Sequence, residues 1–155
     1  MRALIFTRAI RCWYDCDMPT VSAIIQAGGQ SRRMGTDKAL IDYHGRPILV
    51  HVINLLRHLS DDVIVVANRA DVYGPIVSAQ RARLVPDYDP PSGPLGGIAA
   101  GLSAMTHELA IVVACDMPLL NLDLLHYLIE RAAGFDAVVP LTGDQYEPLH
   151  AVYRR

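Results

Sequence analysis

The apolar residues of this chain fall into short unbroken runs, separated by longer stretches in which apolar residues recur at helical spacing. Apolar runs without polar alternation are typical of strands that are buried on both faces of a sheet. They predict strands at residues 21–27, 63–67, 83–85, 109–114 and 136–140.

Helical spacing predicts helices between several of these strands. Pro47 opens the first helix, over residues 47–59, a helix of small residues covers 95–105, and Asn121 can cap another that ends at Gly134. The alternation of strands and helices predicts an α/β fold with a mainly parallel sheet that is covered by helices. In such sheets, ligands bind beyond the carboxyl ends of the strands, where the strand order reverses.

The loop after the first predicted strand reads QAGGQSRRMGTDK, from Gln26 to Lys38. Gly28 lacks a Cβ, as does the glycine after it, so main-chain N–H groups there can approach an oxyanion closely. Arg32, Arg33 and Lys38 supply positive charge for a polyphosphate. The loop therefore predicts a site for a nucleotide.

Two better-known nucleotide loops are excluded by spacing. A Walker A motif has its lysine directly after the last glycine, whereas Thr36 and Asp37 separate Gly35 from Lys38 here. The dinucleotide pattern GxGxxG needs a glycine where this chain has Gln30. A plain glycine turn with solvated charges around it is the alternative interpretation.

The loop after the third predicted strand reads PDYDPPSGPLGG and begins at Pro86. Its prolines and glycines favour a stiff main-chain surface that a base can approach closely. Asp87 directly follows the strand and is the better candidate to contact a sugar or base, whereas Asp89 is the weaker one. The alternative is an ordinary helix start, with Ser92 as the cap and Gly93 as the entry.

The third loop, in VVACDMPLL, places Asp116 at the end of an apolar strand that Pro118 terminates. A carboxylate there needs a partner, and Mg²⁺ is one, because this ion takes one or two carboxylates together with phosphate oxygens. The alternative is that Asp116 only caps the following turn. We interpret Cys115 and Met117 as packing residues.

Composition narrows the class of protein. A chain of 155 residues with 52% hydrophobic and 19% charged residues has the size of one domain. The net charge of −2 provides no basic field for nucleic acid, and no apolar run approaches the roughly 20 residues that span a bilayer. The three cysteines match no zinc or redox motif, so we expect reduced thiols and a cytoplasmic location. Residues 1–17 make a poor signal peptide and are expected to form a poorly ordered extension.

With these motifs in hand, the sequence resembles the molybdenum cofactor guanylyltransferases. The resemblance runs from about Val21 to Arg155 and rests on AGGQSRRMGTDKAL, GPLGGIAAGL, CDMPLL and PLHAVY, in that order. It implies a Rossmann-like, three-layer α/β/α nucleotidyltransferase fold. It also implies transfer of GMP from GTP to molybdopterin that carries molybdenum, with release of pyrophosphate.

The resemblance also implies roles for residues at matching positions. Lys38 and Arg33 would bind phosphate, Asp87 would contact the nucleoside, and Asp116 would hold both Mg²⁺ and the nucleotide. The remaining contacts with GTP would come from the main chain of Gln26, Ala27 and Gly28 and from Gly93, which would border the guanine.

Two features depart from the family pattern. Gln26 stands where an aliphatic residue is usual, and family members continue well past PLHAVY. We therefore expect residues 18–155 to be a nucleotidyltransferase domain that lacks its C-terminal part. Two alternatives stay open: a CTP-dependent molybdopterin cytidylyltransferase and an inactive, truncated GTP-binding protein. The substrates imply a possible protein partner that delivers molybdopterin.

Overall fold

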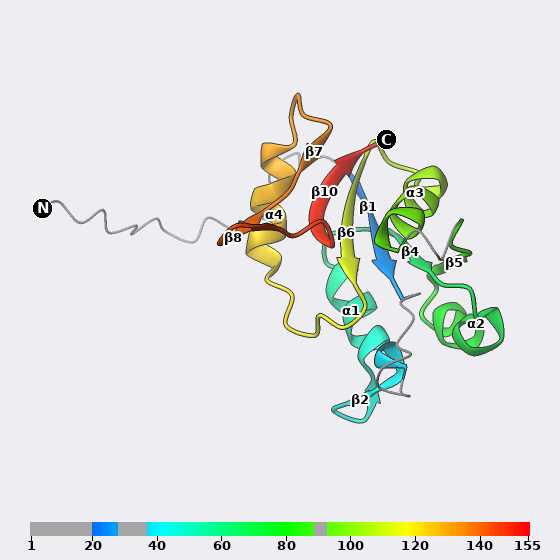
Figure 1. Cartoon of the computed structure of the whole chain (residues 1–155). Coiled ribbons are helices and arrows are strands. Elements are labelled where there is room, and N and C mark those ends of the chain that lie inside the picture. The colour runs from blue at the N-terminus through cyan, green and yellow to red at the C-terminus, as the bar shows by residue number, and fades with distance from the viewer. Residues whose placement is uncertain (1–19, 28–36, 89–92) are drawn as a thin grey trace, which may run out of the picture.

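The apolar runs form a central six-stranded sheet with the order β5-β4-β1-β6-β10-β7 (Figure 1). The computed structural model describes residues 20–27, 37–88 and 93–155. The strands are β1 (Val21–Gln26), β4 (Asp62–Val66), β5 (Arg83–Val85), β6 (Leu109–Ala114), β7 (Ala137–Val138) and β10 (His150–Arg154). β1 pairs in parallel with β4 and β6, and β4 pairs in parallel with β5. Among the strands that the described residues place in this sheet, β10 alone runs in the opposite direction, antiparallel to β6 and β7, so the prediction of a mainly parallel sheet is confirmed.

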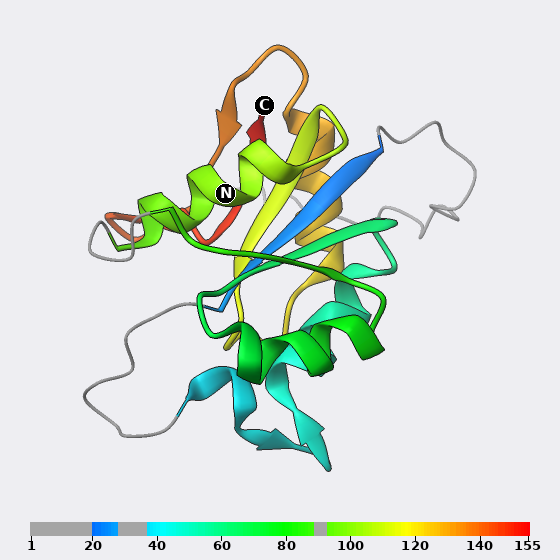
Figure 2. The same ribbon diagram turned by 90° about the vertical axis from the view of Figure 1, so that its right-hand side faces the viewer.

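Helices cover both faces of this sheet. They are α1 (Ile48–Leu56), α2 (Ala70–Ala79), α3 (Pro94–Ala104) and α4 (Leu122–Arg131). Side chains of α1, α2 and α4 share one buried cluster with alternate residues of β1, whereas α3 packs in a second cluster with Ile24. Figure 2 shows α3 and α4 on opposite sides of the strands. The arrangement is the predicted three-layer α/β/α sandwich, and no helix in the described part of the chain is long and apolar enough to cross a bilayer.

Glycine spacing in α3 sets how closely this helix approaches β1. A Cβ added at Gly101 would lie 2.4 Å from Cγ2 of Ile24, and one at Gly97 would lie 2.3 Å from Nε2 of Gln26. Both distances are far below van der Waals contact, so a larger residue at Gly97 would displace the Gln26 side chain. At Gly101 it would press against the buried Ile24 and push the helix from the sheet. The small-residue pattern predicted for residues 95–105 therefore has a packing reason.

Several predicted elements differ from the observed ones. The strand expected at 136–140 is reduced to β7, because only two of its residues pair with β10. Asn121 caps α4 as predicted, accepting a hydrogen bond from the N–H of Leu124 at 3.1 Å, but the helix ends at Arg131, before Gly134. Helix α2 was not predicted, because Pro75 and the glycine before it interrupt the apolar spacing.

Short elements complete the described part of the chain. They are the 3₁₀ turn η2 (Lys38–Leu40) and two antiparallel strand pairs: β2 (Asp42–Tyr43) with β3 (Arg46–Pro47), and β8 (Leu141–Thr142) with β9 (Gln145–Tyr146). The β2-β3 pair connects η2 to α1 in the sequence. It was not predicted, because two-residue strands are too short to show alternation.

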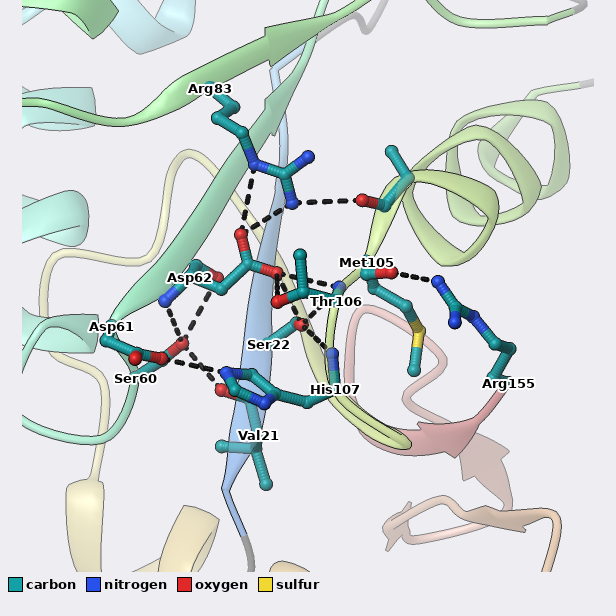
Figure 3. Close-up of polar contacts among 11 residues, drawn as sticks. Val21, Ser22, Ser60, Asp61, Asp62, Arg83, Met105, Thr106, His107 and Arg155 are labelled. Atoms are coloured by element: carbon teal, nitrogen blue, oxygen red, sulfur yellow. Dashed lines mark hydrogen bonds and ion pairs between the residues drawn. The ribbon is translucent and has the colours of Figure 1, made fainter.

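A polar network centred on Asp62 joins the amino ends of β1 and β4 (Figure 3). Its Oδ2 accepts hydrogen bonds from Ser22 Oγ at 2.6 Å and from Thr106 N and Oγ1 at 3.0 and 2.8 Å. Its Oδ1 accepts from Arg83 Nε at 3.1 Å. Burial acts to raise the pKa of Asp62, but these hydrogen bonds together outweigh it and lower the pKa to about 2. The network lies at the edge of the sheet opposite to the three predicted loops.

Candidate active site

The strand order reverses between β1 and β6. From β1 the chain moves to β4 and then to β5 on one side, and it afterwards returns to form β6 on the other side of β1. In an open α/β sheet such a reversal leaves a crevice at the carboxyl ends of the two central strands. Here those ends lead to Ala27 and Cys115, where the first and third predicted loops begin.

The side chains of Lys38 and Asp116 meet beyond these strand ends. Lys38 Nζ lies 3.0 Å from Asp116 Oδ2, and the two side chains are 48% and 37% exposed. The hydrogen bond to Asp116 and then the charge of its carboxylate raise the pKa of Lys38 above its ordinary value. The first and third loops therefore meet at one site, as predicted from the ends of parallel strands.

Asp116 is more exposed than the sequence suggested. The strand β6 is buried, but it ends at Ala114, and Asp116, two residues beyond it, has an exposed side chain. Its charge partner in this structure is the ammonium group of Lys38. We expected Asp116 to need a partner because it would be buried at the end of a strand. That reason was wrong, because its side chain is exposed.

Main-chain and side-chain bonds hold the third loop in place. The N–H of Cys115 donates to the carbonyl of Gln26 at 3.0 Å, which extends the pairing of β1 and β6 by one residue. Nε2 of His51, on α1, lies 3.0 Å from the carbonyl oxygen of Pro118. Cys115 is buried, and burial raises its pKa to about 12, so its thiol packs rather than reacts. Met117 packs partly buried against the same core, which confirms both packing predictions.

Gln26 connects the first loop to the second. Its Nε2 donates to the carbonyl of Pro94 at 3.0 Å, and its Oε1 is buried without a hydrogen-bond partner among the described residues. The N–H of Ala27 donates to the carbonyl of Val66 at 2.9 Å, so it is not available to a phosphate. The predicted main-chain contacts of Gln26 and Ala27 with GTP remain predictions, and the amide of Gln26 has a structural role that the sequence did not indicate.

Asp87 lies at the same edge of the sheet, beyond β5. It is buried, with 9% of its surface exposed, and its N–H donates to Oδ1 of Asn68 at 2.9 Å. Asn68 follows β4, so the ends of two neighbouring strands come together here. Gly93 caps α3 with a φ of +67°, a conformation that glycine adopts without strain. Their predicted contacts with a nucleoside are not tested by this geometry.

Some predicted site residues lie outside the described part of the chain. They are Gly28 and Arg33, together with Arg32, Asp89 and Ser92. The predicted role of Arg33 in binding phosphate therefore stays a prediction. The described residues bring together Lys38 and Asp116 directly, and they join Gln26 to the turn that begins α3.

Most of the chain matches a known family of proteins. Residues 23–155 match the MobA-like NTP transferase domain. The chain belongs to this family of nucleotidyltransferases. The match covers the three loops of the site and the β10 segment, and it confirms the family resemblance inferred from the sequence motifs.

Curated relatives carry consistent names. The chain is 41% identical, over 141 residues, to the molybdenum cofactor guanylyltransferase of Pseudomonas fluorescens (strain Pf0-1), covering 87% of this chain and 68% of the relative. It is 37% identical to the probable molybdenum cofactor guanylyltransferase of Peptoclostridium acidaminophilum, covering 86% of this chain and 62% of that relative. The chain thus spans roughly two thirds of the length of these relatives.

A solved structure supports the same fold. It is the molybdopterin-guanine dinucleotide biosynthesis protein A from Archaeoglobus fulgidus, which superposes with a TM-score of 0.70 at 26% identity. The alignment covers 86% of this chain and 67% of that one. The predicted nucleotidyltransferase fold is therefore confirmed.

Proposed function

We propose that this protein transfers GMP from GTP to the terminal phosphate of molybdopterin that carries molybdenum, with release of pyrophosphate. The observation that carries the proposal is the pair formed by Lys38 and Asp116, which places a cation and a carboxylate 3.0 Å apart at the switch point of the sheet. The names of the relatives support the choice of substrates.

In this reaction a phosphate oxygen of molybdopterin attacks the α-phosphorus of GTP. One oxygen–phosphorus bond forms while the bond from the α-phosphorus to the bridging oxygen of the β-phosphate breaks, and pyrophosphate leaves with that electron pair. The attacking oxygen is already anionic, so no general base is required. The protein holds the reactants in line and neutralises charge.

Lys38 is the residue that we assign to charge neutralisation. Its side chain is 48% exposed, and its ammonium group lies beyond the ends of β1 and β6, where phosphate oxygens can reach it. The hydrogen bond to Asp116 and the charge of Asp116 raise its pKa further above neutral, so the ammonium group stays charged as an ordinary lysine does. A lysine used in this way acts as a mobile point charge that follows the phosphates.

Asp116 fits a magnesium ion. Its carboxylate is half-exposed, and oxygen is the ligand that Mg²⁺ prefers. Within residues 20–27, 37–88 and 93–155, no group of three or more His, Cys, Asp and Glu gathers as a metal site. A single protein carboxylate is enough for Mg²⁺, whose other ligands are commonly phosphate oxygens and water. When bound, the ion would offset the negative charge of the triphosphate, while Lys38 would exchange Asp116 for a phosphate oxygen.

The base would lie toward α3 and the end of β5. Gly93 and the buried Asp87 border this region, and the bond from Gln26 to Pro94 holds the start of α3 against β1. The turn GPLGG resembles the guanine-specific branch of the family, which favours GTP over CTP.

One assay tests the proposal: the purified chain is incubated with GTP, Mg²⁺ and molybdenum-loaded molybdopterin, and pyrophosphate is measured. We expect release that requires all three components and falls at least tenfold when CTP replaces GTP. Faster release with CTP would identify a cytidylyltransferase. Binding of GTP without release of pyrophosphate would identify a nucleotide-binding protein without transferase activity.

A further inference from the structure

Tyr73 is buried next to the candidate active site, and its hydroxyl group contacts two separate segments of the site. The residue belongs to α2 and is 3% exposed. Its hydroxyl group lies 2.6 Å from Oδ2 of Asp37 and 3.2 Å from the carbonyl oxygen of Ala27. Because the hydroxyl has one proton, the shorter contact to the carboxylate takes the larger share of it.

The two partners of Tyr73 stand on either side of the glycine-rich segment in the sequence. Ala27 directly follows β1, and Asp37 directly precedes Lys38. One buried hydroxyl group therefore contacts both the residue that follows β1 and the residue that precedes Lys38. No sequence pattern indicated this, because the contact spans 36 positions between Asp37 and Tyr73 and comes from a helix that was not predicted.

Asp37 has further bonds that place Lys38. Its Oδ1 accepts from the N–H of Ala39 at 3.2 Å and so caps η2, the turn that contains Lys38. Arg69 Nη1 lies 3.3 Å from Oδ2. The Asp37 side chain is 20% exposed; Arg69 offsets its charge, and the Tyr73 hydroxyl group donates a hydrogen bond to it. A carboxylate held in this way neither repels a nearby phosphate strongly nor competes with Asp116 for the ammonium group of Lys38.

We propose that Tyr73 is a positioning residue, which acts through Asp37 to hold the Lys38 ammonium group in place beside Asp116. The proposal deepens the proposed function and rests on it, since it assigns to Lys38 the task of neutralising phosphate charge. Tyr73 itself does not contact the reactants.

The hydroxyl group of Tyr73, rather than its ring, makes the contact that holds Asp37 in place. The ring packs in the buried cluster below β1, so a phenylalanine retains this packing. Loss of the hydroxyl leaves the Asp37 carboxylate without its shortest hydrogen bond, which frees Asp37 to turn toward Lys38. Burial and then the hydrogen bond to Asp37 raise the pKa of Tyr73 above its ordinary value, which already lies above neutral, so the hydroxyl group is protonated and can donate.

The test compares Tyr73→Phe with a matched control, Tyr153→Phe. Tyr153 lies on β10, and its hydroxyl group donates a hydrogen bond to the carbonyl of Pro148 at 2.9 Å. Both substitutions remove one hydroxyl group and leave a buried or half-buried ring. Similar melting temperatures for the two variants would show that any difference in turnover does not come from unfolding.

Two readouts separate this proposal from the proposed function. The first needs no substrate: Lys38 is the single lysine of the chain, so ¹³C-lysine labelling yields one Cε signal in an NMR spectrum. Asp116→Asn provides the reference position for a Lys38 that has lost its ion pair. We expect Tyr73→Phe to move the signal toward this reference and Tyr153→Phe to leave it unchanged.

The second readout is pyrophosphate release. We expect Tyr73→Phe to lower kcat/KM for GTP about tenfold, the size of effect typical of one hydrogen bond to a charged group. In a Lys38→Ala background the same substitution should cost less than twofold, because the group that it positions is absent.

An unchanged lysine signal in Tyr73→Phe, or an equal loss of activity with and without Lys38, overturns the role of Tyr73. Absence of pyrophosphate release from the wild-type chain would instead overturn the proposed function, and the lysine signal would still show whether Tyr73 controls the position of Lys38.

Discussion

Lys38 Nζ lies 3.0 Å from Asp116 Oδ2, although 78 positions separate the two residues in the sequence. Lys38 follows β1 and Asp116 follows β6, and these two strands are parallel neighbours on either side of the reversal in strand order. The topology therefore brings the only lysine of the chain to a carboxylate that suits Mg²⁺. This contact is the basis of the first two predictions.

Lys38→Ala is expected to lower the rate of guanylyl transfer by about a hundredfold to a thousandfold. A cation about 4 Å from a phosphate oxygen interacts by roughly 4 kcal/mol at an effective dielectric constant of 20, of which part is regained from solvent. Steady-state pyrophosphate release measures the loss. Arg131→Ala removes an equal charge from α4, where the guanidinium lies over the ring of Tyr127, and should leave the rate unchanged. A loss below threefold for Lys38→Ala would remove the residue from the mechanism.

Asp116→Asn is expected to weaken turnover that depends on Mg²⁺ at least as much as Lys38→Ala does. The amide keeps the size of the side chain but loses the charge that attracts the ion. A titration of the rate with Mg²⁺ should show a higher requirement for the ion in the variant. A wild-type rate at saturating Mg²⁺ would show that Asp116 does not hold the metal in the reaction.

Gly101→Ala is expected to destabilise the fold by about 1 to 3 kcal/mol, because the new methyl group would lie 2.4 Å from Cγ2 of the fully buried Ile24. Ser103→Ala is the control within the same helix, since Ser103 is exposed and its hydroxyl group donates to the carbonyl of Ala99, in the same helix, at 2.9 Å. That control should change the stability by less than about 0.5 kcal/mol. Urea unfolding measures both. Equal effects would mean that α3 does not pack as closely on β1 as this structure has it.

Low pH is expected to lower the free energy of unfolding, because Asp62 becomes protonated. Its pKa in the folded chain, about 2, lies below the ordinary 3.8, so the unfolded chain binds the proton more tightly. The stabilisation is present above pH 4 and is lost as the pH falls from about 4 toward 2. It amounts to roughly 1 to 2 kcal/mol after allowance for screening by solvent.

The Asp62 prediction is checked by urea unfolding of the wild type and Asp62→Asn between pH 6 and pH 2.5. The free energy of unfolding of the variant should start lower and depend less on pH over this range. Parallel curves for the two proteins would show that other carboxyl groups cause the acid sensitivity.

The sequence by itself determined the class of fold and the position of the loops. Unbroken apolar runs such as 109–114 are typical of strands that are covered on both faces, and the helices between them favour parallel strands. Parallel strands end at the same edge, so the meeting of Lys38 and Asp116 was predictable from their places after β1 and β6. These are local properties, because each depends on a few neighbouring residues and on one general rule of topology.

Only the tertiary structure decided which side chains support this site. The bonds of Tyr73 to Asp37, and of Gln26 to Pro94, join segments that are 36 and 68 positions apart. Such contacts depend on how the helices pack on the sheet. Helix α2, which carries Tyr73, contains a proline and a glycine that interrupt its apolar spacing, so the sequence pattern did not predict it. Burial of Asp116 was likewise misjudged, because the buried run that includes β6 ends at Cys115 and the side chain of Asp116 is exposed. Sequence patterns record which residues are apolar, whereas the position of a polar side chain depends on partners that only folding brings near.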